Sequence, residues 1–267
     1  MTNIKQTAPE THSAETIVKE FGRFSGSVNP RTLFTDFCQL YSLALQNCLV
    51  MPGSPVWEQN ESEYLRTIQK YDKADADHFT YIVSMLVNAM NNAHKRKGVY
   101  DDVLGLVFEQ LDMGNERLGQ FFTPMELCNL MAQMEMRQVR EMLQSQPYVT
   151  IGEPCVGAGR QILAAANVLL TEGFNPALHM VAECWDVDYL SVNMSYITFT
   201  LADIPAVIVH GNALSMKQIN PPIRTYAWYR GGFRRVKPEL VPETNTDIEP
   251  EISAIEPVKP AGQMLLF

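Results

Sequence analysis

Three short runs of β-type residues alternate with longer helix-like stretches in the second half of the chain, and this alternation limits the possible folds more than any other feature. The β-type runs span residues 148–152, 179–183 (with an extension to 185 left open) and 206–209; the helix-like stretches span 161–170 and 189–201. Strands that alternate with helices form βαβ units around a parallel sheet. We therefore expect an α/β fold here.

Helical periodicity precedes this region. Between Leu33 and Leu45 the apolar residues recur on one helix face, and Met51-Pro52-Gly53-Ser54-Pro55 ends the pattern. Three more helices are expected at 58–71, around 79–97 and at 101–111. A further helix is expected to begin at Thr123, with Thr123 as the N-cap, Pro124 in the first turn and Glu126 closing a capping box.

These patterns divide the chain into four parts. Residues 1–28 are polar without a sustained period and predict a flexible arm. Residues 29–117 predict a helical N-terminal domain whose apolar faces form a core, and 118–236 predict the α/β domain. Residues 237–267 predict a disordered acidic tail, because the stretch 237–262 holds five prolines and six acidic residues.

Composition excludes several classes of protein. No apolar run approaches the ~18–20 residues of a membrane span, and the first twenty residues do not resemble a secretory signal. The five cysteines are scattered without a CxxC, which argues against a disulfide framework or a metal site and favours a reducing cytoplasm. The net charge of −9 argues against wrapping DNA by bulk charge, so any nucleic-acid contact must be local or assisted.

The most specific motif is Glu153-Pro154-Cys155-Val156-Gly157-Ala158-Gly159, between the first predicted strand and the next helix. Glycine lets the backbone turn tightly and approach a ligand, and ligands of open parallel sheets bind at such strand ends. Asp186, at the end of the second strand, could hold a ribose diol through its two carboxylate oxygens. The alternative is a tight turn without a ligand.

This motif, preceded by Gly119-Gln120-Phe121-Phe122-Thr123-Pro124, resembles the N-6 adenine DNA methyltransferases. The similarity is greatest to the modification subunits of bacterial type I restriction-modification systems. The resemblance implies a truncated Rossmann-like sheet, S-adenosylmethionine as cofactor, DNA as substrate and a specificity subunit as partner. It also implies that the cofactor contacts are Phe122, Thr123, Glu153, Gly157, Gly159, Asp186 and, in place of the family's aspartate near the adenine, Asn212.

The family's catalytic motif, which follows a fourth strand, is similar to Asn220-Pro221-Pro222-Ile223. The resemblance implies that Asn220, Pro221 and Pro222 hold the target amine, but an aliphatic residue stands where the family has a base-stacking aromatic ring. Seven residues between Asn212 and Asn220 leave little room for a loop and a buried strand, so an accidental turn is the alternative. The family's further strands and target-recognition region have no counterpart in the acidic tail.

Two functions therefore remain open: a DNA adenine methyltransferase, and a catalytically impaired accessory protein that binds S-adenosylmethionine or DNA. A strand directly before Asn220 in the sheet would favour the first. The basic clusters 94–97 and 224–235 are candidate DNA contacts, although the first also suits a solvated helix C-terminus.

The chain ends in a short peptide that resembles the bacterial sliding-clamp-binding motif. This peptide consists of Gln263, Met264, Leu265, Leu266 and Phe267. A Leu-Phe pair can fill an apolar pocket while the glutamine makes polar contacts, and a flexible leash lets the peptide reach a partner. The alternative is that the peptide packs on its own domain.

Overall fold

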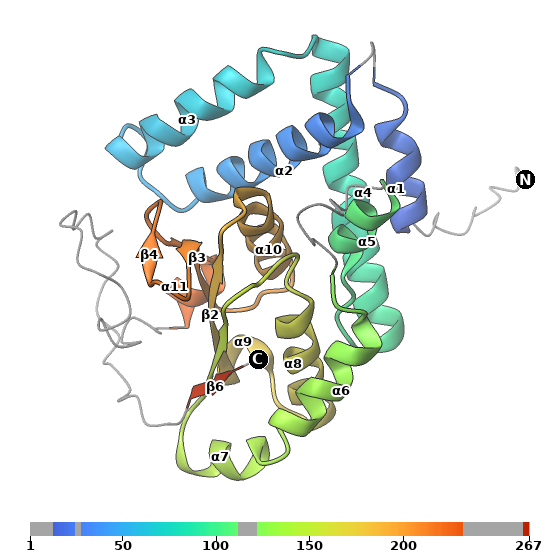
Figure 1. Cartoon of the computed structure of the whole chain (residues 1–267). Coiled ribbons are helices and arrows are strands. Elements are labelled where there is room, and N and C mark those ends of the chain that lie inside the picture. Colours follow the sequence, from blue (N-terminus) through green and yellow to red (C-terminus); the bar gives the residue numbers. More distant parts are fainter. Residues whose placement is uncertain (1–12, 25–27, 112–121, 232–263, 267) are drawn as a thin grey trace, which may run out of the picture.

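The computed structural model describes residues 13–24, 28–111, 122–231 and 264–266, and within these it shows an α/β fold around a parallel sheet (Figure 1). The central strands are β1 (Val149–Glu153), β2 (Met180–Asp186) and β3 (Ala206–Asn212). Their order in the sheet is β3-β2-β1, and both pairings are parallel. The α/β prediction is confirmed, and each strand lies within a few residues of its expected position.

The register brings the carboxyl ends of the three strands to one edge. Val149 pairs with Met180 and Glu153 with Cys184, while Asp186 pairs with His210. The strands are buried along most of their length because they carry Val, Ile, Ala and Cys without polar alternation, as expected for a parallel sheet covered by helices. Glu153, Asp186 and Asn212, which end the strands, therefore lie near one another.

One face of the sheet is covered by α8 (Arg160–Thr171) and α10 (Tyr189–Leu201). Ile151, Ile162 and Tyr196 are fully buried in the core between them. The other face packs against α11 (Tyr226–Arg230), whose Trp228 joins a smaller cluster with Trp185, Val207 and Val209. The short helix α9 (Pro176–His179) leads into β2, and α7 (Val139–Ser145) leads towards β1.

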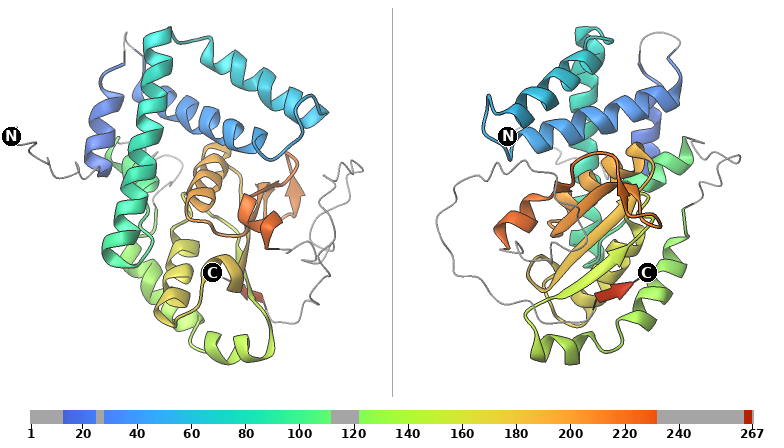
Figure 2. Two further views of the ribbon diagram at one scale, coloured as in Figure 1. Left: turned by 180° about the vertical axis from the view of Figure 1, so that it is seen from behind. Right: turned by 60° about the vertical axis from the view of Figure 1, so that its left-hand side comes forward.

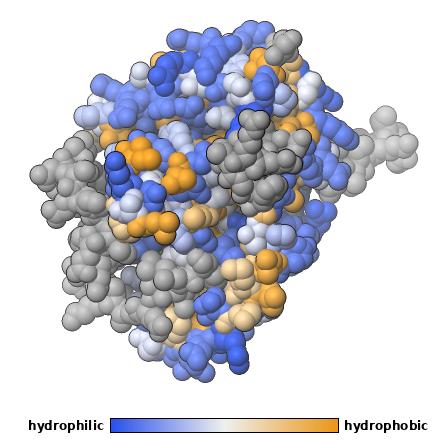
Figure 3. Space-filling model, viewed as in Figure 1, coloured by the Kyte–Doolittle hydropathy of each residue, from blue (hydrophilic) through white to orange (hydrophobic). Residues whose placement is uncertain are grey.

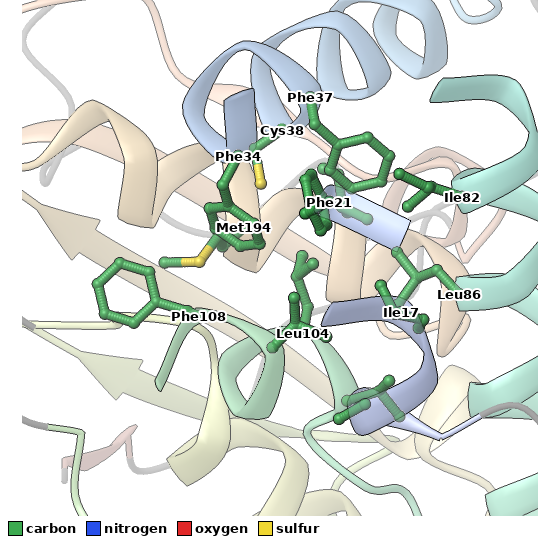
Figure 4. Close-up of a cluster of buried hydrophobic side chains, with 14 of the residues drawn as sticks. Ile17, Phe21, Phe34, Phe37, Cys38, Ile82, Leu86, Leu104, Phe108 and Met194 are labelled. Atoms are coloured by element: carbon green, nitrogen blue, oxygen red, sulfur yellow. The ribbon is translucent and has the colours of Figure 1, made fainter. Parts of the chain in front are cut away.

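The helical part consists of α1 (Ala14–Phe21), α2 (Pro30–Asn47), α3 (Pro55–Ile68), α4 (Lys73–Lys97) and α5 (Val103–Gln110). Its core is continuous with the α/β part, because Met194 and Ile197 of α10 lie in the same buried cluster as Phe34 and Leu104 (Figure 4). The helical unit therefore packs directly against α10, the helix that follows β2.

The flexible-arm prediction for residues 1–28 is wrong for the segment 13–24. Ser13 caps α1 by accepting a hydrogen bond from the Thr16 backbone N–H, and the Thr16 hydroxyl bonds back to complete a capping box. Ile17 and Phe21 then fill the helical core, where Phe21 contacts Phe37 edge to face. Ile17 and Phe21, with Ala14 beside them, anchor a short helix that otherwise carries mostly polar residues.

The start of one expected helix differs. Helix α6 (Met125–Glu135) has Pro124 as its N-cap and no side-chain cap hydrogen bond, so the capping box expected at Thr123 does not form. The carbonyl of Thr123 instead accepts hydrogen bonds from Arg160 and from the Cys128 thiol.

Among the helices of the described ranges, none is both long and apolar enough to cross a membrane.

The sheet departs from a doubly wound order after β3. Strands β4 (Lys217–Gln218) and β5 (Ile223–Arg224) turn back and pair antiparallel with β3. The place beside β1, where the doubly wound order puts the next parallel strand, is taken by β6 (Met264–Leu266), drawn in red beside β1 in Figure 2. The prediction of a disordered tail is therefore wrong for 264–266, while residues 232–263 lie outside the described part.

Candidate cofactor-binding site

The turn between β1 and α8 is fastened to the end of β2. The Val156 N–H donates to the Trp185 carbonyl at 2.9 Å, and the Gly157 N–H donates to Oδ2 of Asp186 at 2.9 Å. Within the turn, Glu153 Oε1 accepts the Cys155 N–H at 2.9 Å. These bonds connect two carboxylates predicted from the sequence, Glu153 and Asp186, through the glycine loop that lies between them.

Both glycines of the turn occupy conformations that disfavour a side chain. Gly157 has φ +54° and Gly159 has φ +98°. A Cβ on Gly157 would lie 2.9 Å from the ring of Phe122, and a Cβ on Gly159 would lie 2.6 Å from the ring of Phe199. Phe122 comes from a segment far earlier in the chain, so the structure brings three predicted cofactor residues together: Phe122, Gly157 and Asp186.

Asp186 uses both carboxylate oxygens. Oδ2 accepts from Gly157, and Oδ1 accepts the Asp188 N–H at 2.9 Å. Burial raises the pKa of Asp186, while the hydrogen bonds from the Asp188 and Gly157 backbones act in the opposite direction. Burial likewise raises the pKa of Glu153, opposed by the Cys155 N–H. Each oxygen of Asp186 has a second lone pair, so it can accept one further hydroxyl donor.

Asn212, expected to accept a hydrogen bond from the cofactor adenine, is engaged in its own turn. Its Oδ1 accepts the backbone N–H groups of Leu214 at 2.9 Å and Ser215 at 3.2 Å. The side chain therefore stabilises the start of the β3–β4 connection. Thr123 is exposed just before α6, and residues 119–121 of the same motif lie outside the described ranges.

The Asn-Pro-Pro motif lies beside β3, near the edge of the sheet opposite to β1. It consists of Asn220, Pro221 and Pro222. A strand, β4, does precede Asn220, but it has two residues and pairs antiparallel with β3. Nδ2 of Asn220 donates to Nδ1 of His210 at 2.9 Å; Nε2 of His210 then carries the proton and lies 3.2 Å from the Val187 carbonyl. Asn220 is thus linked only through His210 to Val187, the residue after Asp186, and no parallel fourth strand leads into the Asn-Pro-Pro motif within the described residues.

Exposed apolar side chains gather beside this hairpin. Leu214 is 97% exposed, Ile219 59% and Val187 62%. Figure 3 shows hydrophobic side chains over the region of β3 and β4, with a second group over α6. Apolar surface therefore borders the candidate site on the β3 side.

Sequence reasoning missed Arg160, which follows Gly159 directly. The residue is 7% exposed, and its guanidinium contacts Asp102, Glu109 and the Thr123 carbonyl. Arg160 is the one charged residue of α8, at the helix end where the dipole disfavours a cation. A single arginine at the start of an otherwise uncharged, largely buried helix was the available indication that carboxylates must lie nearby.

No protein-family model and no curated protein matches this chain. Among solved structures, it is similar to a protein from Listeria monocytogenes proposed to be a class I S-adenosylmethionine-dependent methyltransferase, with 17% sequence identity and a TM-score of 0.39. The match covers 73% of this chain and 57% of that one. The chain thus spans little more than half of that protein.

Proposed function

We propose that this chain binds S-adenosylmethionine at the turn 153–159, as a protein of the DNA adenine N-6 methyltransferase type. The observation that carries the proposal is the hydrogen bond from the Gly157 N–H to Asp186, with the Phe122 ring against the same glycine. Three segments distant in sequence, each expected to contact the cofactor, meet at the carboxyl end of the sheet. Such strand ends are where open α/β sheets bind ligands.

The residues suit the parts of this cofactor. The free lone pairs of Asp186 accept the two ribose hydroxyls, and the glycine backbone gives the methionine part close access beside Phe122. The bound cofactor supplies a sulfonium methyl group for transfer to an exocyclic amine. The chain's part in such a transfer is alignment of the two reactants, which needs no strong base.

Calorimetry with S-adenosylmethionine tests the proposal. The substitution Gly157→Val should abolish detectable binding, because a side chain there meets Phe122 and strains a positive φ. Gly173→Val is the matched control: Gly173 also has a positive φ, +83°, but nothing lies within 4 Å of its Cβ position. Absence of binding by the unaltered protein would refute the proposal.

The second candidate is the accessory protein that binds the cofactor or DNA without efficient catalysis. It is favoured by the position of Asn220 beside His210, on the β3 side of the sheet. On this hypothesis a partner, such as a specificity subunit, completes the active assembly on DNA in the bacterial cytoplasm. Transfer of labelled methyl groups to unmethylated DNA, with and without candidate partners, separates the two. Robust turnover by the chain alone would favour the enzyme.

A further inference from the structure

We propose that Arg160 is a positioning residue that couples the helical unit to the candidate site by holding Phe122 and Thr123 against the 153–159 turn. The inference rests on the proposed function for its role in binding, and on geometry for the coupling itself. Arg160 is buried at the start of α8, where both desolvation and the helix dipole act against a positive charge. Such a placement needs dedicated anions.

Both anions come from one helix, α5. Nε of Arg160 lies 2.5 Å from Oδ2 of Asp102, and the two terminal nitrogens lie 2.8 and 2.9 Å from the two oxygens of Glu109. Burial alone would lower the pKa of Arg160, but the bonds to Glu109 and Asp102 raise it, so the charge persists. Asp102 also caps α5 through the Gly105 N–H at 2.8 Å. The guanidinium therefore contacts carboxylates near both ends of α5.

The remaining contacts of Arg160 point to the site. One terminal nitrogen donates to the Thr123 carbonyl at 3.2 Å, and the guanidinium carbon lies 5.5 Å from the centre of the Phe122 ring. Phe108 of α5 supports that ring from another side, with centroids 4.9 Å apart. A pure stability role would need only the carboxylates. The contacts to Phe122 and Thr123 mean that the ring beside Gly157 is held by α5 through Arg160.

Glu109→Gln is the mildest test, because the Glu109 side chain is 39% exposed and its loss leaves the Asp102 pair intact. Arg160→Lys is the second variant, since lysine keeps the charge but not the planar fork. Arg140→Gln is a matched control: Arg140 also bonds a glutamate, Glu172, and lies over a ring, Phe174, away from the site. Affinity for S-adenosylmethionine is measured by calorimetry, and the Tm is measured alongside.

We expect Glu109→Gln and Arg160→Lys to weaken binding about tenfold, and Arg140→Gln to leave it unchanged. In a Phe122→Ala background the effect of Glu109→Gln should largely vanish, because it acts through that ring. Lowered Tm values with an unchanged Kd would show that the ion pairs of Arg160 only stabilise the fold, and would overturn the proposal. A full effect in the Phe122→Ala background would also overturn the proposal.

Hydrogen exchange without cofactor separates this inference from the proposed function. Glu109→Gln should speed exchange in peptides covering 153–159 and leave those covering β3 unchanged, whether or not S-adenosylmethionine binds. Unchanged exchange at 153–159 would refute the coupling even if the protein binds the cofactor. Failure of the unaltered protein to bind, with faster exchange in the variant, would refute the cofactor and keep the coupling.

Discussion

Glu183 is a carboxyl group placed inside the sheet. It occupies the middle of β2, in register with Gly152 on one side and Val207 on the other, and its Oε1 is buried with no hydrogen-bond partner among the described residues. Burial raises the pKa of Glu183 to about 7. Because this folded-state pKa exceeds the ordinary value, the protonated form is the one the fold favours.

The protein should therefore lose stability as the pH rises through about 7. The contribution of Glu183 to the free energy of unfolding is fully present below its ordinary pKa near 4.5. It amounts to about 1–2 kcal/mol after allowance for partial exposure. Thermal unfolding at pH 5 and pH 8 measures it, and Glu183→Gln should flatten the difference. Glu126→Gln, at an exposed position on α6, is the control. An equal pH dependence in Glu183→Gln would contradict the assignment.

Asn220 gives a prediction that bears on catalysis. Its side chain is exposed and bonds His210, so Asn220→Ala should change the free energy of unfolding by less than about 0.5–1 kcal/mol and leave the Kd for S-adenosylmethionine within about twofold. Calorimetry and chemical denaturation check both values. If the chain does transfer methyl groups and Asn220→Ala abolishes the transfer, Asn-Pro-Pro is catalytic despite its position beside β3.

At the scale of elements, the C-terminal peptide has two alternative binding partners: strand β1 of its own sheet and the proposed sliding clamp. Residues 264–266 pair with Thr150, Ile151 and Gly152 of β1, and the same residues form most of the clamp-binding-like motif. A peptide paired as a strand beside β1 cannot at the same time dock in a pocket of another protein, so the two destinations exclude each other. We propose that the sliding clamp binds only the released peptide.

Removal of residues 263–267 should abolish binding to an immobilised sliding clamp in surface plasmon resonance. It should also speed hydrogen exchange in β1, while β3 keeps its protection, because β1 becomes an edge strand. A reversed C-terminal sequence, with the same composition, controls for bulk hydrophobicity. Equal clamp binding by intact and truncated chains would mean that the tail serves another purpose.

The elements also show what sequence could and could not predict. The strands and helices of 148–212 were predictable because short apolar β-type runs alternate regularly with helix-like stretches and glycines separate them, as at Gly157 and Gly173. Helix α1 was missed because its buried face is short, with Ile17 and Phe21 as its large apolar residues. Strand β6 was missed because a pairing between Ile151 and Leu265 leaves no local pattern. Arg160 was missed because its carboxylate partners come from a distant helix.

At the scale of the whole molecule, the helical unit and the sheet are joined through α10, which contributes Met194 to the buried cluster of the helices and Tyr196 to that of the sheet. Phe34 of α2 is fully buried and contacts Phe108, which in turn contacts Phe122 at the candidate site. Phe34→Ala should therefore lower the free energy of unfolding by about 3–5 kcal/mol. We expect one thermal transition with a lowered Tm, not two transitions of which one is shifted. Differential scanning calorimetry checks this. Two separate transitions, with only one shifted, would show independent domains.

The position of β6 also has a kinetic consequence. The β1–β2 and β2–β3 pairs are each joined by one crossover, whereas β1 and β6 lie at widely separated points of the chain, so closing their loop is entropically the most expensive step. We expect the βαβ units to assemble first. Until the last strand arrives, apolar β1 presents an open edge that can pair with other chains. Yield on refolding should therefore fall as protein concentration rises, and excess soluble peptide of the β6 sequence should restore it.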